Sequence, residues 1–145
     1  MSRFASSFFG ALALSAAVLG AQAANAGPAG GFVARNGYIV QPIAGSDAFT
    51  VLGKAGGAGP DYFCAAADYA YRRLGVSDVD RVVLINPVAP DPAFNGRRSG
   101  AFRAVSRDQV PPRTGLTVSM RQAGENLQIA HGRNLCDQRK IFLDD

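Results

Sequence analysis

The sequence predicts a single α+β domain, in which an antiparallel sheet of about six to seven short strands carries one main helix. Short runs of alternating apolar and polar residues, separated by turn residues, are typical of antiparallel strands. Residues 60–74 carry the clearest helical periodicity. A chain of 145 residues, 48% of them apolar, is long enough for one domain with its own core.

The first three strands follow one another through short turns. Residues 32–35 and 38–43 flank Asn36 and Gly37, and Asn-Gly is the dipeptide most typical of a two-residue hairpin turn. Residues 48–52 come after a further turn and alternate in the same way. We therefore expect this part of the chain to form a three-stranded antiparallel meander.

Residues 60–74 have helix signals at both ends. Pro60 suits the first helical position, Asp61 suits the first turn, and Gly75 suits the C-terminal cap. One apolar stripe is expected to pack on the sheet; its members are Phe63, Ala66, Ala67, Ala70 and Leu74. The residues that fall off this stripe are Tyr62, Asp68, Tyr69, Arg72 and Arg73.

Two strands separated by a long loop are expected after the helix. Residues 82–85 are continuously apolar and β-branched, which indicates a central strand covered on both faces. Residues 86–100 contain three prolines and predict a loop, and residues 101–106 predict the next strand.

The last strands are expected to form a hairpin. Residues 116–120 and 126–129 both alternate between apolar and polar side chains, and the turn residues 123–125 join them. Residues 131–145 carry no pattern that assigns them to a helix or a strand.

Residues 1–26 are expected to be a cleavable signal peptide. An apolar run over residues 8–19 is broken by Gly20, and Ala24-Asn25-Ala26 fits the small-x-small cleavage rule. The run is shorter than the roughly 20 apolar residues of a membrane span. The mature protein is then residues 27–145, with a flexible leader at 27–31, no membrane span and a periplasmic or secreted location.

The two cysteines of the chain, Cys64 and Cys136, are expected to form a disulfide. Export places them in an oxidising compartment, where an even pair usually becomes a bridge. In the chain-entropy model, closing a loop of this length stabilises the fold by up to roughly 4 kcal/mol.

Several function classes find little support in the composition. A net charge of +4, which drops by one when Arg3 leaves with the signal, is too small and too dispersed to predict nucleic-acid binding. A single histidine argues against a metal site. The glycine-rich segment 53–59 lacks the Gly-Lys-Ser/Thr ending of a phosphate-binding loop, so no cofactor is expected.

A group of arginines is the candidate ligand-contact surface. Four of them lie in a short span and could hold the carboxylate or phosphate of a small anionic ligand; they are Arg97, Arg98, Arg103 and Arg107. Asp91 and Asp108 flank the group and reduce its net charge. The alternative is a solvated loop and strand face.

Cys64 and His131 are the candidate catalytic pair. A cysteine near a helix N-terminus can act as a nucleophile, with a histidine from a later segment as its base. The segment FCAAADYAYRRLGV resembles the nucleophile helix of the bacterial papain-like cell-wall peptidases, which implies a cysteine hydrolase. That family usually has Asp before its cysteine and Ser-Gly after it, where this chain has Phe63 and Ala65-Ala66. A disulfide would leave Cys64 no thiolate.

As a whole, the chain resembles small exported proteins of gram-negative bacteria to which no activity is assigned, and this resemblance implies no ligand. The sequence favours a non-enzymatic binding module of the cell envelope, whose partner is an envelope macromolecule or a small anionic ligand. The alternatives are the hydrolase that uses Cys64 and His131, acting on a cell-wall or peptide substrate, and a purely structural envelope component.

Overall fold

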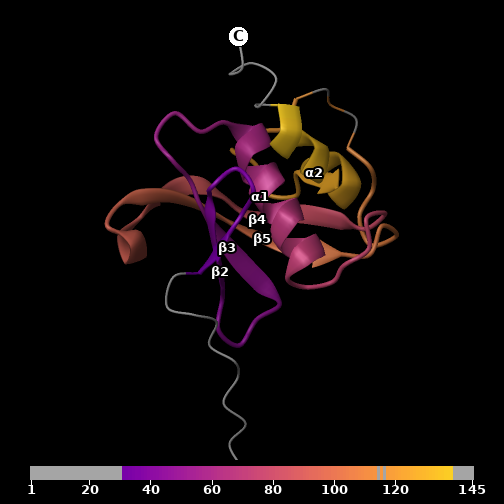
Figure 1. The fold of residues 1–145 in the computed structure, drawn as a ribbon, viewed down its shortest axis with the longest axis horizontal. Helices are drawn as coiled ribbons and strands as arrows, with labels where there is room; N and C mark the ends of the chain where they lie inside the picture. Colours follow the sequence, from indigo (N-terminus) through magenta and orange to yellow (C-terminus); the bar gives the residue numbers. More distant parts are fainter. Residues whose placement is uncertain (1–30, 114, 116, 139–145) are drawn as a thin grey trace, which may run out of the picture.

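The computed structural model describes residues 31–113, 115 and 117–138. Six strands form one sheet in the order β1-β2-β3-β5-β4-β6, and all neighbouring strands are antiparallel. Helix α1 lies over one face of this sheet and α2 packs beside it (Figure 1). The elements are β1 (Phe32–Val33), β2 (Ile39–Pro42), β3 (Ala48–Leu52), α1 (Gly59–Arg72), β4 (Arg81–Asp91), the 3-10 helix η1 (Pro92–Phe94), β5 (Arg97–Val105), β6 (Asn126–Gln128) and α2 (Ile129–Gln138). The predicted α+β fold is confirmed.

The meander β1-β2-β3 is confirmed, including its Asn36-Gly37 turn. Gly37 has φ 74°, which favours glycine, and its N–H donates to the carbonyl of Ala34 at 2.7 Å. The N–H of Ala34 in turn donates to the carbonyl of Tyr38 at 2.9 Å. These two hydrogen bonds close the turn between β1 and β2.

The core lies between α1 and the sheet. Phe63 of α1 meets Phe102 of β5 edge to face at 5.3 Å, and Phe49 of β3 stacks beside Phe102 at 6.3 Å. Val51 and Leu84 are fully buried in the same cluster. The central strand predicted at 82–85 is part of β4, which lies between β5 and β6.

The expected single apolar stripe on α1 is wrong in part. Every residue from Asp61 to Ala70 is buried, including Tyr62 and Tyr69, whereas Leu74 lies beyond the helix and is 45% exposed. Tyr62 meets the ring of Tyr38, and Tyr69 meets the rings of Phe32 and Phe49. In addition α2, which was not predicted from the sequence, covers a flank of α1. Ala67 contacts Gly132 of α2 there.

Asp68 is the buried charge that ties α1 to the start of the sheet. Its side chain is fully buried. One oxygen accepts from the backbone N–H of Arg35 and from the guanidinium of Arg72, both at 3.0 Å, and the other lies 3.3 Å from the Arg35 guanidinium. Buried carboxylates require such partners, which explains why Asp68 can lie inside the fold.

The loop predicted at 86–100 is wrong. Strands β4 and β5 continue through it as one long hairpin with η1 at its tip. Pro87 is tolerated because it falls at a bulge of β4. Pro90 is tolerated because β6 pairs only with Arg81–Val83, so that β4 has a strand neighbour on one side only at Pro90.

The strand predicted at 116–120 is not formed in its described part, and the expected hairpin with residues 126–129 is absent there. Val118 and Met120 do pack against the core, and the carbonyl of Met120 accepts from the N–H of Val88 at 2.9 Å. Gly124 instead bonds to the carbonyl of Leu84 at 2.8 Å. The alternating pattern arises because Val118 and Met120 pack against the core. A segment can bury alternate side chains in this way without pairing as a strand.

The remaining expectations concern the chain before the sheet. Residues 1–30 lie outside the described residues, and with them the predicted signal peptide and most of the leader at 27–31. Within the described part of the chain, no helix has the length and apolarity needed to cross a membrane.

Candidate functional site

The predicted disulfide is confirmed. Cys64 in the first half of α1 is bonded to Cys136 near the end of α2, with 5.1 Å between their Cα atoms and 72 residues between them in the sequence. Both cysteines are buried. Gly132 lies one turn before Cys136, so both residues face α1. A Cβ on Gly132 would lie 2.6 Å from the Cβ of Ala67, and glycine therefore permits the close approach of the helices.

The structure does not bring Cys64 and His131 together as a catalytic pair. Cys64 carries no free thiol because it is half of the disulfide. His131 lies next to Gly132 on α2 and is exposed. Neighbouring helix positions differ by about 100° in direction, so His131 is turned away from the face that holds Cys136. This arrangement offers neither a nucleophile nor a base in contact with it.

The four candidate arginines do not converge on one surface. Arg97 and Arg103 lie six residues apart on the same face of β5, about 20 Å at the usual rise of a strand. Arg103 pairs with Asp47 at 2.9 Å, and Arg107 lies beyond the strand, 3.7 Å from Asp108. Two of the four are therefore neutralised by carboxylates on exposed parts of the surface.

Arg97 and Arg98 are held by the protein itself. The Nε–H of Arg97 donates to the carbonyl of Gly53 at 2.6 Å, and Arg98 donates to the carbonyl of Val88 at 3.1 Å. Arg98 also hydrogen-bonds the Tyr62 side chain; burial raises the pKa of Tyr62, and the cation of Arg98 limits the rise. Both arginines thus brace the end of the sheet.

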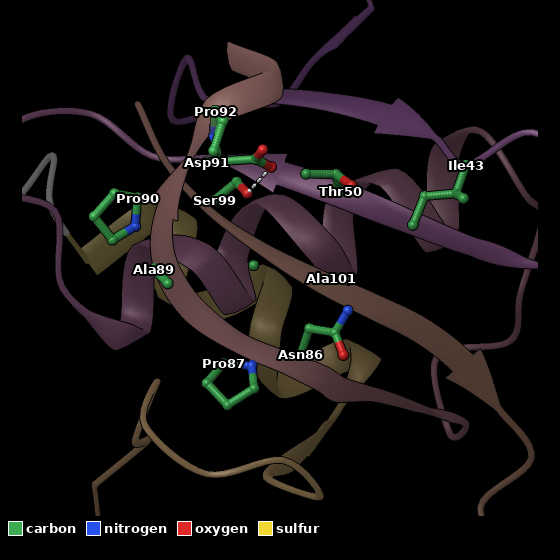
Figure 2. Close-up of a pocket in the computed structure, with 11 residues that line it drawn as sticks. Ile43, Thr50, Asn86, Pro87, Ala89, Pro90, Asp91, Pro92, Ser99 and Ala101 are labelled. Atoms are coloured by element: carbon green, nitrogen blue, oxygen red, sulfur yellow. Dashed lines mark hydrogen bonds between the residues drawn. The ribbon is translucent and has the colours of Figure 1, made fainter. Parts of the chain in front are cut away.

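A trough of about 250 Å³ lies on the face of the sheet that is turned away from α1 (Figure 2). Its floor is formed by Ser99, Gly100 and Ala101 of β5. Ser99 and Ala101 alternate with Phe102, which contacts α1, so their side chains point to the opposite face. The walls come from β3, from the residue after β2 and from the bulged part of β4; they are Ile43, Thr50, Asn86, Pro87, Ala89, Pro90, Asp91 and Pro92.

Local sequence explains why this face is hollow. Ser99 and Ala101, which both point to this face from β5, are small and leave little side-chain bulk above the floor. The pairing of β4 with β5 shifts register between Leu84 and Asn86 and again between Asn86 and Ala89. Bulges bend a strand, and Figure 2 shows β4 curving around one side of the trough.

Asp91 supplies the charge of the trough. One carboxylate oxygen accepts from the Ser99 hydroxyl at 2.7 Å and the other from the N–H of Ala93 at 2.9 Å. Thr50 lies beside this pair, whereas Asn86 lies toward the other end of the trough (Figure 2). Asp91 is half-buried, and the described part of the chain contains no salt bridge to it.

The sequence analysis missed all the polar residues of this trough. It treated Asp91 only as a charge beside the arginines, and it placed Asn86 and Ser99 in a loop. The available signal was the small size of Ser99 and Ala101, because residues two positions apart lie on the same face of a strand and leave that face uncovered when both are small. Across the residues that the structure describes, no group of three or more His, Cys, Asp and Glu could hold a metal ion.

The chain matches no protein-family model, no curated protein and no solved structure. The function of the candidate site is therefore inferred from its residues and their geometry.

Proposed function

We propose that this chain is an exported, non-enzymatic binding module of the cell envelope and that its ligand occupies the trough over β5. The observation that carries the proposal is the trough itself, which combines a floor of small residues, apolar walls and a few convergent polar groups. Binding sites for small molecules have this composition.

The chemistry of the trough favours binding over catalysis. Of the described residues that line it, Asp91 is the one with an acidic or basic side chain, and its two oxygens are already engaged with Ser99 and the backbone of Ala93. General acid–base catalysis and nucleophilic catalysis both need a second group placed against the first. The disulfide also argues against nucleophilic catalysis by Cys64, because it leaves this residue no free thiol.

Export is supported by two independent features. The first 26 residues follow the pattern of a signal peptide. The disulfide between Cys64 and Cys136 is of a kind that persists in oxidising compartments. Together these features favour the periplasm or the extracellular space as the place where the ligand is met.

Thermal unfolding with fractionated small molecules from a bacterial envelope tests this proposal. Ligands that bind the native state raise Tm by mass action. We expect at least one fraction to raise the Tm of the mature protein but not of Thr50→Trp, in which the indole fills the trough. Val33→Trp is the matched control, because Val33 lies on the edge strand β1 and is 59% exposed; this variant should respond as the wild type does.

A fraction that stabilises Thr50→Trp as strongly as the wild type would place the ligand elsewhere and overturn the proposal. So would the failure of every fraction to stabilise the wild type.

A further inference from the structure

We propose that the trough binds an alkylammonium group, with the ammonium against the carboxylate of Asp91. This inference rests on the proposed function and names the class of its ligand. It concerns the amine chemistry that a free diamine shares with the side chain of a lysine in a peptide.

Charge gives the first argument. Of the described residues that line the trough, Asp91 is the one with a charge. Its cross-strand neighbour is Arg97, but that guanidinium is directed to the carbonyls of Gly53 and Leu52 at the end of β3. Most other described carboxylates are paired with a cation; they are Asp47, Asp68, Asp78, Asp108, Glu125 and Asp137. Within the described part of the chain, the carboxylate of the trough is therefore not in a salt bridge.

Hydrogen-bonding capacity gives the second argument. A carboxylate has about four lone-pair positions, and Asp91 uses one on each oxygen. The Ser99 hydroxyl donates its only hydrogen to Asp91, so it can only accept from a ligand. The Thr50 hydroxyl lies beside them (Figure 2). An ammonium group has three hydrogen-bond donors and no acceptor. It therefore matches the Asp91 carboxylate and the Ser99 hydroxyl, which can only accept hydrogen bonds from a ligand.

The walls give the third argument, because they suit the methylene groups behind the ammonium. Proline rings, Ile43, Ala89 and Ala101 flank the polar end of the trough. Burial of methylene groups against such surfaces is favourable because it removes apolar area from water. An amine on an alkyl chain can therefore place its charge at Asp91 and its chain over Ala101.

The same geometry disfavours two other ligand classes. A guanidinium binds best as a planar fork across both oxygens of a carboxylate, and the donors that already occupy one position on each oxygen of Asp91 compete with that arrangement. An anion would be desolvated beside a carboxylate with no cation among the described lining residues. A compact ammonium meets neither obstacle.

Calorimetric titration of the mature, disulfide-bonded protein tests the proposal with two probes. The first is cadaverine, and the second is a short peptide that carries one lysine. We expect the wild type to bind at least one probe, and Asp91→Asn to bind it at least tenfold more weakly. Asp108→Asn is the matched control, since it removes the same charge from a side chain that is 88% exposed and outside the trough; its affinity should equal that of the wild type.

Neutral analogues complete the test. Acetylation of both amines of cadaverine, or of the lysine amine of a peptide whose N-terminus is already acetylated, keeps the chain and removes the charge, so binding should be lost. Binding of cadaverine alone points to a free amine as the source, and binding of the peptide alone points to a protein partner. Equal binding to Asp91→Asn, equal binding of the acetylated probe, or no binding of either probe to the wild type would overturn the proposal.

Failure of this inference can be distinguished from failure of the proposed function. If an envelope fraction stabilises the wild type and Asp91→Asn equally but does not stabilise Thr50→Trp, the trough binds a ligand that is not an amine. If Thr50→Trp is stabilised as well, the trough is not the binding site.

Discussion

Gly132 of α2 packs directly against Ala67 of α1, and one helical turn later Cys136 is bonded to Cys64. The two contacts hold the helices together at short distance, one through the absence of a side chain and one through a covalent bond. This contact buries a flank of α1, whereas the trough lies on the face of the sheet that is turned away from α1.

Enlarging Ala67 should destabilise the protein. Ala67→Leu adds a branched side chain at a contact where even a Cβ added to Gly132 would have no room. Overpacking of a well-packed core costs about 1–3 kcal/mol, so the free energy of unfolding in denaturant should fall by that amount. Ala55→Leu, in an exposed loop, is the control and should change it little. Unaltered stability of Ala67→Leu would mean that α2 does not pack on α1 at this position.

Cys64→Ser and Cys136→Ser should destabilise the protein equally. Each substitution removes the same crosslink across 72 residues, and loss of a native disulfide from a small domain typically costs about 2–5 kcal/mol. Chemical unfolding of both variants, and of the wild type with and without reductant, measures this cost. A variant pair in which Cys64→Ser loses an activity with little change in stability, while Cys136→Ser is nearly silent, would instead favour the cysteine hydrolase.

Asp68→Asn should be among the most destabilising isosteric substitutions in the chain. It leaves Arg35 and Arg72 without their buried counter-charge. Because solvent reaches both guanidiniums, we expect a cost of about 1–3 kcal/mol, which is typical of the loss of one partner from buried hydrogen bonds. Asp137→Asn is the control, because that carboxylate contacts the same Arg35 on the exposed side at 3.4 Å. Similar losses for both variants would contradict the assigned role of Asp68.

Tyr62 should make stability sensitive to alkaline pH. Burial raises its pKa above the ordinary value of 10.0, so the native state holds the phenolic proton more tightly than the unfolded state does. Its contribution is complete below pH 10 and is lost as the pH rises through the higher folded pKa. Tyr62→Phe should therefore lose less stability than the wild type between pH 9 and about 11. Parallel alkaline profiles for the two proteins would contradict this assignment.

Local patterns in the sequence sufficed for the parts of the fold that depend on near neighbours. Asn36-Gly37 predicted the first turn, and Pro60 with Asp61 predicted the start of α1. The helix α2 was not predicted because Gly132 lowers the intrinsic helix propensity of this segment. Gly132 stabilises the fold only through the close packing of α2 on Ala67, which the sequence alone does not show.

The trough could not be predicted for a related reason. The prolines of β4 indicate a loop unless it is known that the strand bulges at Pro87 and has an unpaired edge at Pro90. Thr50 and Ser99 lie far apart in the sequence and meet only through the pairing of β3 with β5. The disulfide was predictable because two cysteines offer a single intramolecular pairing.

An NMR titration tests most directly whether the ligand binds in the trough over β5. The isotope-labelled mature protein is titrated with the envelope fraction that raises its Tm, and backbone amide shifts are followed. The account predicts that the largest shifts fall on residues of the trough, with Thr50, Asp91, Ser99 and Ala101 among them, and that they are lost in Thr50→Trp. Shifts concentrated around Arg103 and Arg107, or around the Cys64–Cys136 disulfide, would contradict it.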